Sequence, residues 1–225
     1  MSELQQRLER LMLRLDHMGM RVEQSVIDAL QAAENADSQA GLAVDRNDSV
    51  IDREEVQIEQ ECIRLLALYQ PAAIDLRTIC TIIKVNSDLE RIADLASSIG
   101  RRVKHVVEDH VDLEQNAGFQ ELRNATLEIL GMTVRMLNST NAETAGRVME
   151  FDQQIDDLYK CFVQRVLDSQ DRQIGGAEAV LTMINLAKAA ERIGDLCTNI
   201  AEDIIFLKTG DVVRHADAFD DNYDQ

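Results

Sequence analysis

The sequence predicts an all-α protein whose six helices form two tandem three-helix bundles related by an internal repeat. Its 225 residues are 45% hydrophobic but only 4% aromatic, and they include no Trp and one Pro. Strands favour aromatic and β-branched residues, whereas Leu, Ala, Glu, Gln and Arg favour helices. Apolar residues also recur three or four positions apart through six long segments, and motifs of the first half return in the second.

Three helices are predicted in the first half, at about residues 4–35, 44–69 and 71–108. In the first of them, apolar residues keep a helical spacing over the whole stretch from Leu4 to Ala33. The segment 36–41 contains Asp, Ser and Gly, so we expect it to separate the first two helices. Pro71 ends the second helix, because the residue before a proline avoids the α region.

The second half repeats this plan, with helices predicted at about residues 117–139, 141–171 and 176–208. Each helix is too amphipathic to stand alone, so three are expected to pack together in each half. After Lys208 the helical pattern stops and five Asp follow, which predicts a disordered acidic tail. The predicted domains are therefore a first repeat at 1–112, a second repeat at 113–210 and the tail at 211–225.

Short motifs support the duplication. Gly-Met-Arg-Val at 19–22 resembles Gly-Met-Thr-Val at 131–134. Asp-Leu-Glu-Arg-Ile-Ala-Asp at 88–94 resembles Ala-Ala-Glu-Arg-Ile-Gly-Asp at 189–195. Self-similarity of this kind indicates two copies of one structural unit.

Charge and cysteine usage restrict the classes of function. The formal net charge is −18, which disfavours nucleic acid, since such partners require a basic surface. No apolar run is long enough to span a bilayer, and the N-terminal residues do not form a signal peptide, so we expect a protein that is not integral to the membrane. The four Cys form no Cys-x-x-Cys pair and lie within helical patterns, which favours reduced thiols and a cytoplasmic location.

Acidic residues occupy the inward stripes of four of the predicted helices. With 41 acidic residues in the chain, pairs four apart arise often by chance, so their position on the helix matters more than their spacing. Two carboxylates about 6 Å apart repel by roughly 3 kcal/mol at an effective dielectric constant near 20. Protons, an arginine or a cluster of cations could compensate this repulsion, and the residues alone leave these alternatives open. The candidate residues are Asp48, Asp52, Glu90 and Asp94 in the first half, and Asp152, Asp156, Glu191 and Asp195 in the second.

No catalytic constellation is visible, so we do not expect an enzyme. None of the four His follows a Glu at the Glu-x-x-His spacing of di-iron bundles, and there is no Gly-rich phosphate loop. The alternatives are a regulatory adaptor with metal clusters, a metal-dependent hydrolase on a helical scaffold, and a helical scaffold without metal. Metal content and turnover of phosphate esters would distinguish them.

Several motifs together resemble the PhoU family over about residues 2–208. They are Gln-Pro-Ala-Ala-Ile-Asp-Leu-Arg at 70–77, the two Glu-Arg-Ile-x-Asp motifs at 90–94 and 191–195, and Asn-Ile-Ala-Glu at 199–202. The resemblance implies two three-helix bundles, and it implies that the eight acidic residues hold multinuclear metal clusters, with iron or zinc as the metal.

The same resemblance implies a function. The chain would be a cytoplasmic negative regulator of high-affinity phosphate uptake and of the phosphate-starvation response. Its partners would be the ATPase of the phosphate ABC transporter and a sensor histidine kinase, and it could form a homodimer.

The first repeat departs from the motif of the second at three positions, which pair as Ala93 with Gly194, Ser98 with Asn199, and Arg101 with Glu202. Arg101 places a positive charge where a cation would bind. We therefore expect the first-repeat site to bind metal more weakly than the second.

Overall fold

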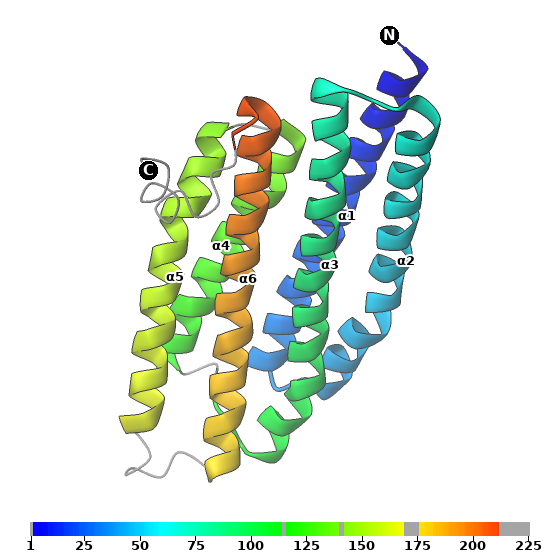
Figure 1. Ribbon diagram of the computed structural model, residues 1–225. Helices are drawn as coiled ribbons and strands as arrows, with labels where there is room; N and C mark the ends of the chain where they lie inside the picture. The colour runs from blue at the N-terminus through cyan, green and yellow to red at the C-terminus, as the bar shows by residue number, and fades with distance from the viewer. Residues whose placement is uncertain (1, 114–115, 140–141, 169–175, 212–225) are drawn as a thin grey trace, which may run out of the picture.

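A computed structural model describes residues 2–113, 116–139, 142–168 and 176–211 of the chain, and within these ranges it contains six helices and no strand. This agrees with the predicted all-α fold (Figure 1). The helices are α1 (Glu3–Glu34), α2 (Ser38–Tyr69), α3 (Ala73–Glu108), α4 (Ala117–Ser139), α5 (Ala142–Asp168) and α6 (Ala177–Thr209).

The helices pack as two bundles of three. Helices α1, α2 and α3 contact one another, and so do α4, α5 and α6. The two bundles meet along two helix pairs, α3 with α6 and α1 with α4, and α2 and α5 lie at the two outer sides (Figure 1). Helices α3 and α6 run in opposite directions (Figure 1), and the equivalent residues Asp94 and Asp195 line one groove between them.

Local sequence explains where α1 begins and which face it buries. Ser2 and Gln5 form a capping box, in which the Gln5 N–H donates to the Ser2 hydroxyl and the Ser2 N–H donates to the Gln5 side chain. The predicted apolar stripe is buried from Leu8 to Ala33, while Leu4 is partly buried. The stripe faces the core because residues three and four apart share a helix face.

The connection between α1 and α2 is shorter than the predicted break at 36–41. Helix α2 begins at Ser38, because the Asp37 side chain accepts hydrogen bonds from the N–H groups of Gln39 and Ala40. Gly41 lies inside the helix, where a Cβ would stand 2.5 Å from the Gly100 carbonyl oxygen of α3. This glycine allows a close approach of two helices and does not end one.

Proline and glycine lie at the ends of other helices, where these residues commonly occur. Helix α2 ends at Tyr69, and its C-cap Gln70 takes a left-handed conformation with φ of 44° directly before Pro71. Gly176 is the N-cap of α6, and Gly210, with φ of 85°, is its C-cap. The Arg77 guanidinium of α3 packs against Gly210. The predicted end of the fifth helix at 171 and the tail at 212–225 lie outside the described residues.

Polar contacts also join the two repeats. Asp203 of α6 is 2% exposed and accepts a charged hydrogen bond of 2.9 Å from Lys84 of α3. At the other end of the same helix pair, the Thr182 hydroxyl donates to Asp109 at 3.2 Å. None of the helices in the described ranges is long and apolar enough to cross a bilayer.

The Gly41–Gly100 contact generates a stability prediction. Gly41→Ala should lower the free energy of unfolding by about 1–3 kcal/mol, because the new methyl group overlaps the backbone of α3. Gly146→Ala is the matched control, since a Cβ there meets nothing within 4 Å, and it should add up to about 1 kcal/mol through helix propensity. Denaturant unfolding measures both. Equal effects of the two substitutions would contradict the packing described.

Candidate metal centre

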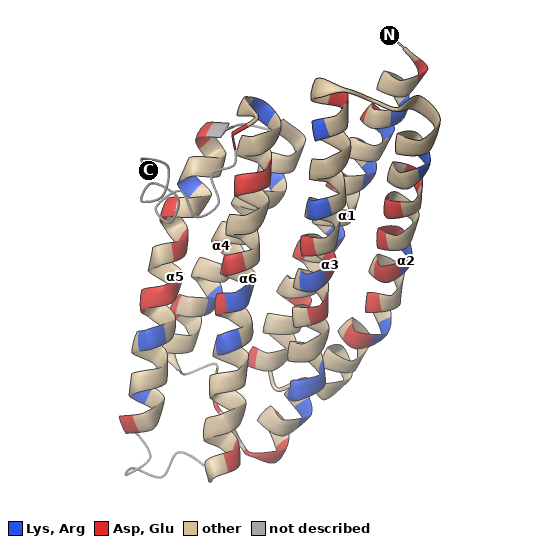
Figure 2. Cartoon of the chain, viewed as in Figure 1, with Lys and Arg blue, Asp and Glu red and all other residues tan. Residues whose placement is uncertain are grey.

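All eight predicted site residues lie on the four helices α2, α3, α5 and α6. Figure 2 shows acidic residues along these helices, with basic residues between them. The first-repeat residues come from α2 and α3, and the second-repeat residues come from α5 and α6. The first group therefore lies where α2 packs against α3, and the second group lies where α5 packs against α6.

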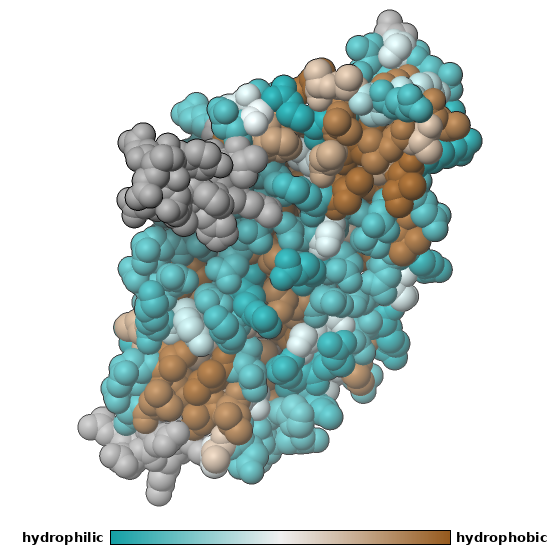
Figure 3. Space-filling view, viewed as in Figure 1, coloured by the Kyte–Doolittle hydropathy of each residue, from teal (hydrophilic) through white to brown (hydrophobic). Residues whose placement is uncertain are grey.

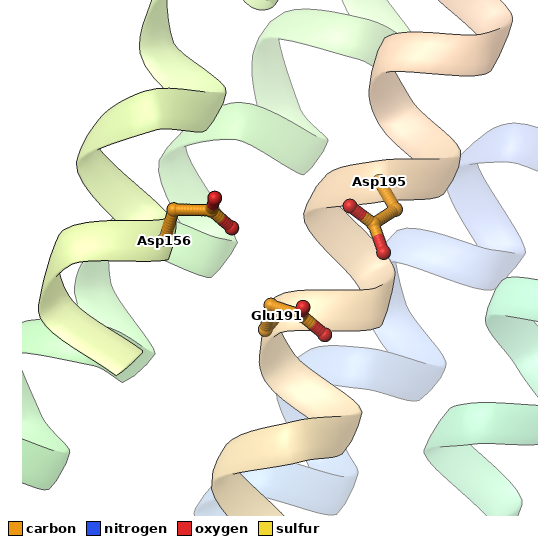
Figure 4. Close-up of side chains that lie close together, drawn as sticks. All are labelled: Asp156, Glu191 and Asp195. Atoms are coloured by element: carbon orange, nitrogen blue, oxygen red, sulfur yellow. The ribbon is translucent and has the colours of Figure 1, made fainter. Parts of the chain in front are cut away.

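Three carboxylates of the second repeat converge. Asp156 of α5 and Glu191 and Asp195 of α6 each offer one oxygen atom, and these atoms lie within 4.8 Å of one another (Figure 4). Over the part of the chain that the structure describes, no other three His, Cys, Asp or Glu side chains meet this condition. Ligand atoms from two helices this close together can share one cation.

Asp152 lies one helical turn before Asp156 and is half-buried. Burial, followed by the charges of Asp195, Asp156 and Glu191, raises its pKa to about 6, and the nearby Thr198 hydroxyl opposes this rise. One of its oxygens, Oδ1, is buried without a hydrogen-bond partner. Asp152 is therefore the carboxylate of this cluster that is most costly to ionise without a compensating charge.

Gly194 makes room for Asp152. A Cβ at this position of α6 would lie 2.9 Å from Asp152 Oδ1 and 3.2 Å from Ile155 Cδ1. Ala93 occupies the equivalent position of the first repeat and is fully buried. In the second repeat the glycine thus leaves the space that the Asp152 carboxylate occupies.

Two lysines partly compensate the second cluster. Lys188 Nζ lies 2.5 Å from Glu191 Oε1 and 5.2 Å from the centre of the Tyr159 ring, and Lys160 Nζ lies 3.5 Å from Asp156 Oδ2. The other carboxylate oxygen of Glu191, Oε2, is buried and has no hydrogen-bond partner. The two lysines therefore leave Glu191 Oε2 and Asp152 Oδ1 without a hydrogen-bond partner.

The first cluster is similar but looser. Burial, followed by the charges of Asp52 and Asp94, raises the pKa of Asp48 to about 6, and Asp48 Oδ1 is also buried and unpartnered. The pKa of Glu90 is raised by burial and then by Asp94, Glu55 and other neighbours. The four acidic residues of the first repeat interact electrostatically. No three of them bring oxygen atoms as close together as the triad of the second repeat does.

Arg101 lies near the first cluster, and the expectation that it weakens metal binding there stays a prediction. It forms an ion pair of 2.5 Å with Asp45 and lowers the pKa of Asp48. The Ser97 hydroxyl donates to the same Asp45 at 2.7 Å. This local cation weakens the case for metal at the first cluster relative to the second.

The sequence analysis missed four residues around the clusters. Glu55 and Asp45 are acidic neighbours of the first cluster, and Ser97 and Thr198 are hydroxyl groups beside the inner aspartates. A signal existed for three of them. Glu55 follows Asp48 by seven residues on the same stripe, and Thr198 follows Ser97 by 101 positions, as Glu191 follows Glu90.

Ser98 and Asn199 take equivalent positions in the two repeats. Together with Asp94 and Asp195 they line an open groove of about 550 Å³ between α3 and α6. Asn199 and Asp195, four residues apart on α6, therefore share one groove.

The residues of both clusters fit a hard cation. Three of their oxygen atoms are buried without partners, on Asp48, Asp152 and Glu191, and carboxylate oxygens are the ligands that divalent and trivalent cations share in multinuclear sites. A cation would satisfy these atoms and offset both the burial and the repulsion that raise the pKa values. It would also link α5 to α6 and α2 to α3.

Comparison with known sequences gives one family. A model of the PhoU domain matches residues 15–103 and again residues 119–204. The chain is 34% identical to the phosphate-specific transport system accessory protein PhoU of Serratia marcescens over 92% of this chain and 85% of that one. It is 36% identical to the PhoU homolog of Pseudomonas aeruginosa, over 88% of this chain and 82% of the relative.

Solved structures agree with the sequence comparison. The crystal structure of PhoU from Pseudomonas aeruginosa covers 93% of this chain, with 32% identity and a TM-score of 0.86. The phosphate transport system regulatory protein PhoU from Streptococcus pneumoniae covers 94% of the chain, with 25% identity and the same TM-score. Both align over almost their whole length, so the two-bundle architecture is shared as a unit.

The raised pKa of Asp152 predicts how pH affects the stability of the protein in the presence of a chelator. Its pKa is about 6 when folded and near 3.8 when unfolded, so folding favours its protonated form and its contribution to stability falls as pH rises through this range. Asp152→Asn should therefore raise the melting temperature at pH 7 more than at pH 4. Asp157→Asn, at an exposed position on the same helix, is the control. Equal shifts at both pH values would contradict the electrostatic account.

Proposed function

The chain belongs to the PhoU family, and we propose that it is an accessory protein of phosphate transport that regulates uptake by contact with partner proteins. The observation that carries this proposal is its identity of more than 30% to named accessory proteins over most of both chains. The names of these relatives describe accessory and regulatory roles. We therefore favour a regulator over an enzyme.

More specifically, we propose that the chain is a cytoplasmic negative regulator of phosphate uptake and of the phosphate-starvation response. Its partners would be the ATPase of the phosphate ABC transporter and a sensor histidine kinase, and homodimer formation can be tested by sedimentation. The state of the thiols supports a reducing compartment. All four Cys are free, and burial raises the pKa of Cys62 and Cys197 to about 12, which keeps these two thiols protonated and unreactive.

Metal binding is a second part of the proposal, and it rests on the geometry of the clusters. Asp156, Glu191 and Asp195, with Asp152 beside them, would hold cations in the second repeat. The looser first-repeat group would hold them less tightly, because Arg101 already supplies positive charge there. Iron and zinc are the metals we propose. A bound cation would supply charge neutralisation and cross-linking of helices, which makes its role structural or regulatory.

The two clusters should differ in metal content. Glu191→Ala with Asp195→Ala should remove more bound metal than Glu90→Ala with Asp94→Ala, because the second-repeat carboxylates converge within 4.8 Å. Elemental analysis by mass spectrometry, on protein purified without chelator or affinity tag, gives the metal per chain. Gly194→Ala should also lower it by displacing Asp152, while Ala93→Gly should not. Equal losses from both pairs, or a parent protein without metal, would refute this assignment.

The regulatory role predicts a phenotype in the host. Deleting the gene should raise phosphate uptake and starvation-response expression when phosphate is plentiful, because a negative regulator is lost. A phosphate-replete reporter assay measures this, with the wild-type chain restoring repression. The matched control is Glu150→Gln, an exposed position of α5 outside both clusters, which should also restore it. Unchanged uptake and expression in the deletion strain would overturn the proposed function.

A further inference from the structure

A second surface lies where the two repeats meet along α1 and α4, apart from the carboxylate clusters. It is an open groove of about 670 Å³, and none of the eight cluster residues lines it. Helix α1 supplies Leu8, Met12 and Leu13, the end of α4 supplies Leu137, and the first turns of α3 supply Asp75 and Thr78. Both bundles therefore contribute to its walls.

The groove offers apolar surface to a partner. Leu13 is 59% exposed, and Met20, which follows it by seven residues on the same face of α1, is 47% exposed. Exposed Ile74 and Leu76 flank Asp75 on α3. Figure 3 shows further hydrophobic residues gathered over the end of the molecule where α2 connects to α3. Scattered exposed leucines are ordinary, but apolar residues that line one groove are typical of interaction sites.

The rim of the groove is acidic and uncompensated. Glu9, Asp16 and Asp75 line it, and no Lys, Arg or His does. Within the described ranges none of the three carboxylates forms an ion pair, although Asn138 donates a hydrogen bond of 3.3 Å to Asp16.

Two arginines of α1 are held on the side of α2. Arg7 pairs with Glu61 at 3.1 Å and Arg14 pairs with Glu54 at 2.8 Å, and both glutamates belong to α2. These two arginines are thus engaged with α2, while the carboxylates of Glu9 and Asp16 line the groove without such a partner.

We propose that this groove is a docking site for a basic amphipathic helix of a partner protein, a proposal that rests on the proposed function as a contact regulator. An apolar stripe on such a helix would cover Met12, Leu13 and Leu137, and flanking Lys or Arg would meet Glu9, Asp16 and Asp75. This is the recognition mode in which a helix binds a hydrophobic groove with charged residues at its edges. A second copy of the chain fits the groove less well, because each copy carries a net charge of −18.

A model peptide tests the docking site on the full-length protein. The probe is a helical peptide of about 15 residues, long enough for a marginally stable helix, with Leu on one face and Lys on the other. Two reference peptides keep its length, one with Glu in place of Lys and one with the same composition in scrambled order. Fluorescence anisotropy should show tightest binding for the ordered Leu–Lys peptide, and added salt should weaken it.

Substitutions in the groove test whether the Leu–Lys peptide binds there. Glu9→Gln, Asp16→Asn and Asp75→Asn together should weaken binding of the Leu–Lys peptide about tenfold, since each exposed ion pair contributes modestly. The control removes three exposed carboxylates elsewhere, by Glu59→Gln, Glu128→Gln and Glu150→Gln, and should change binding less than twofold. Leu13→Ser, an exposed position, should weaken binding without a change in helix content.

Several outcomes overturn the docking site. They are equal loss in the two triple variants, equal binding of the scrambled peptide, and methyl chemical-shift changes confined to residues outside the groove. A shift of the sedimentation coefficient that Leu13→Ser abolishes would assign the groove to a second copy of the chain instead. These failures are separate from failure of the proposed function, because the deletion strain would still lose repression if partners bind elsewhere.

Discussion

Repulsion between partly buried carboxylates at two helix seams is the constraint that shapes this protein. Asp48 in the first repeat and Asp152 in the second have pKa values raised to about 6, first by burial and then by neighbouring acids. Each has an oxygen that is buried without a partner. Such groups oppose folding when ionised, and this is the reason for our proposal that a cation completes each cluster.

The two repeats handle this constraint differently. In the second, Gly194 lets α6 approach Asp152, and three further carboxylates converge nearby, with Lys188 engaging one oxygen of Glu191. In the first, Ala93 replaces the glycine and Arg101 brings a permanent cation to the edge of the cluster. We therefore propose that the second cluster, whose carboxylates converge, binds a cation more tightly than the first, although Lys188 and Lys160 pair with two of its residues.

Much of the fold could be predicted from the sequence, because helical periodicity and the repeated Glu-Arg-Ile-x-Asp motif are local signals. The prediction that Gly41 belongs to a break between helices was wrong. Gly41 is needed for its close contact with Gly100 of α3, and helix propensity carries no information about contacts with another helix. The eight cluster residues could be chosen, but not the difference in compactness between the clusters, which arises from interhelical packing. The groove could not be predicted either, since it joins Leu13 to Leu137, which are far apart in the chain.

The two proposed roles, cation binding and partner docking, fall on two different surfaces. Helices α2, α3, α5 and α6 carry the clusters, and α1 and α4 form most of the apolar groove with the acidic rim. The central claim, that cations complete the clusters, is tested most directly by anomalous X-ray diffraction from crystals of protein purified without chelator. We predict anomalous peaks among the oxygens of Asp156, Glu191 and Asp195, with weaker or no peaks at the first cluster. The account would be contradicted if the cluster carboxylates were ordered without any anomalous peak beside them, or if all anomalous peaks lay outside the two clusters.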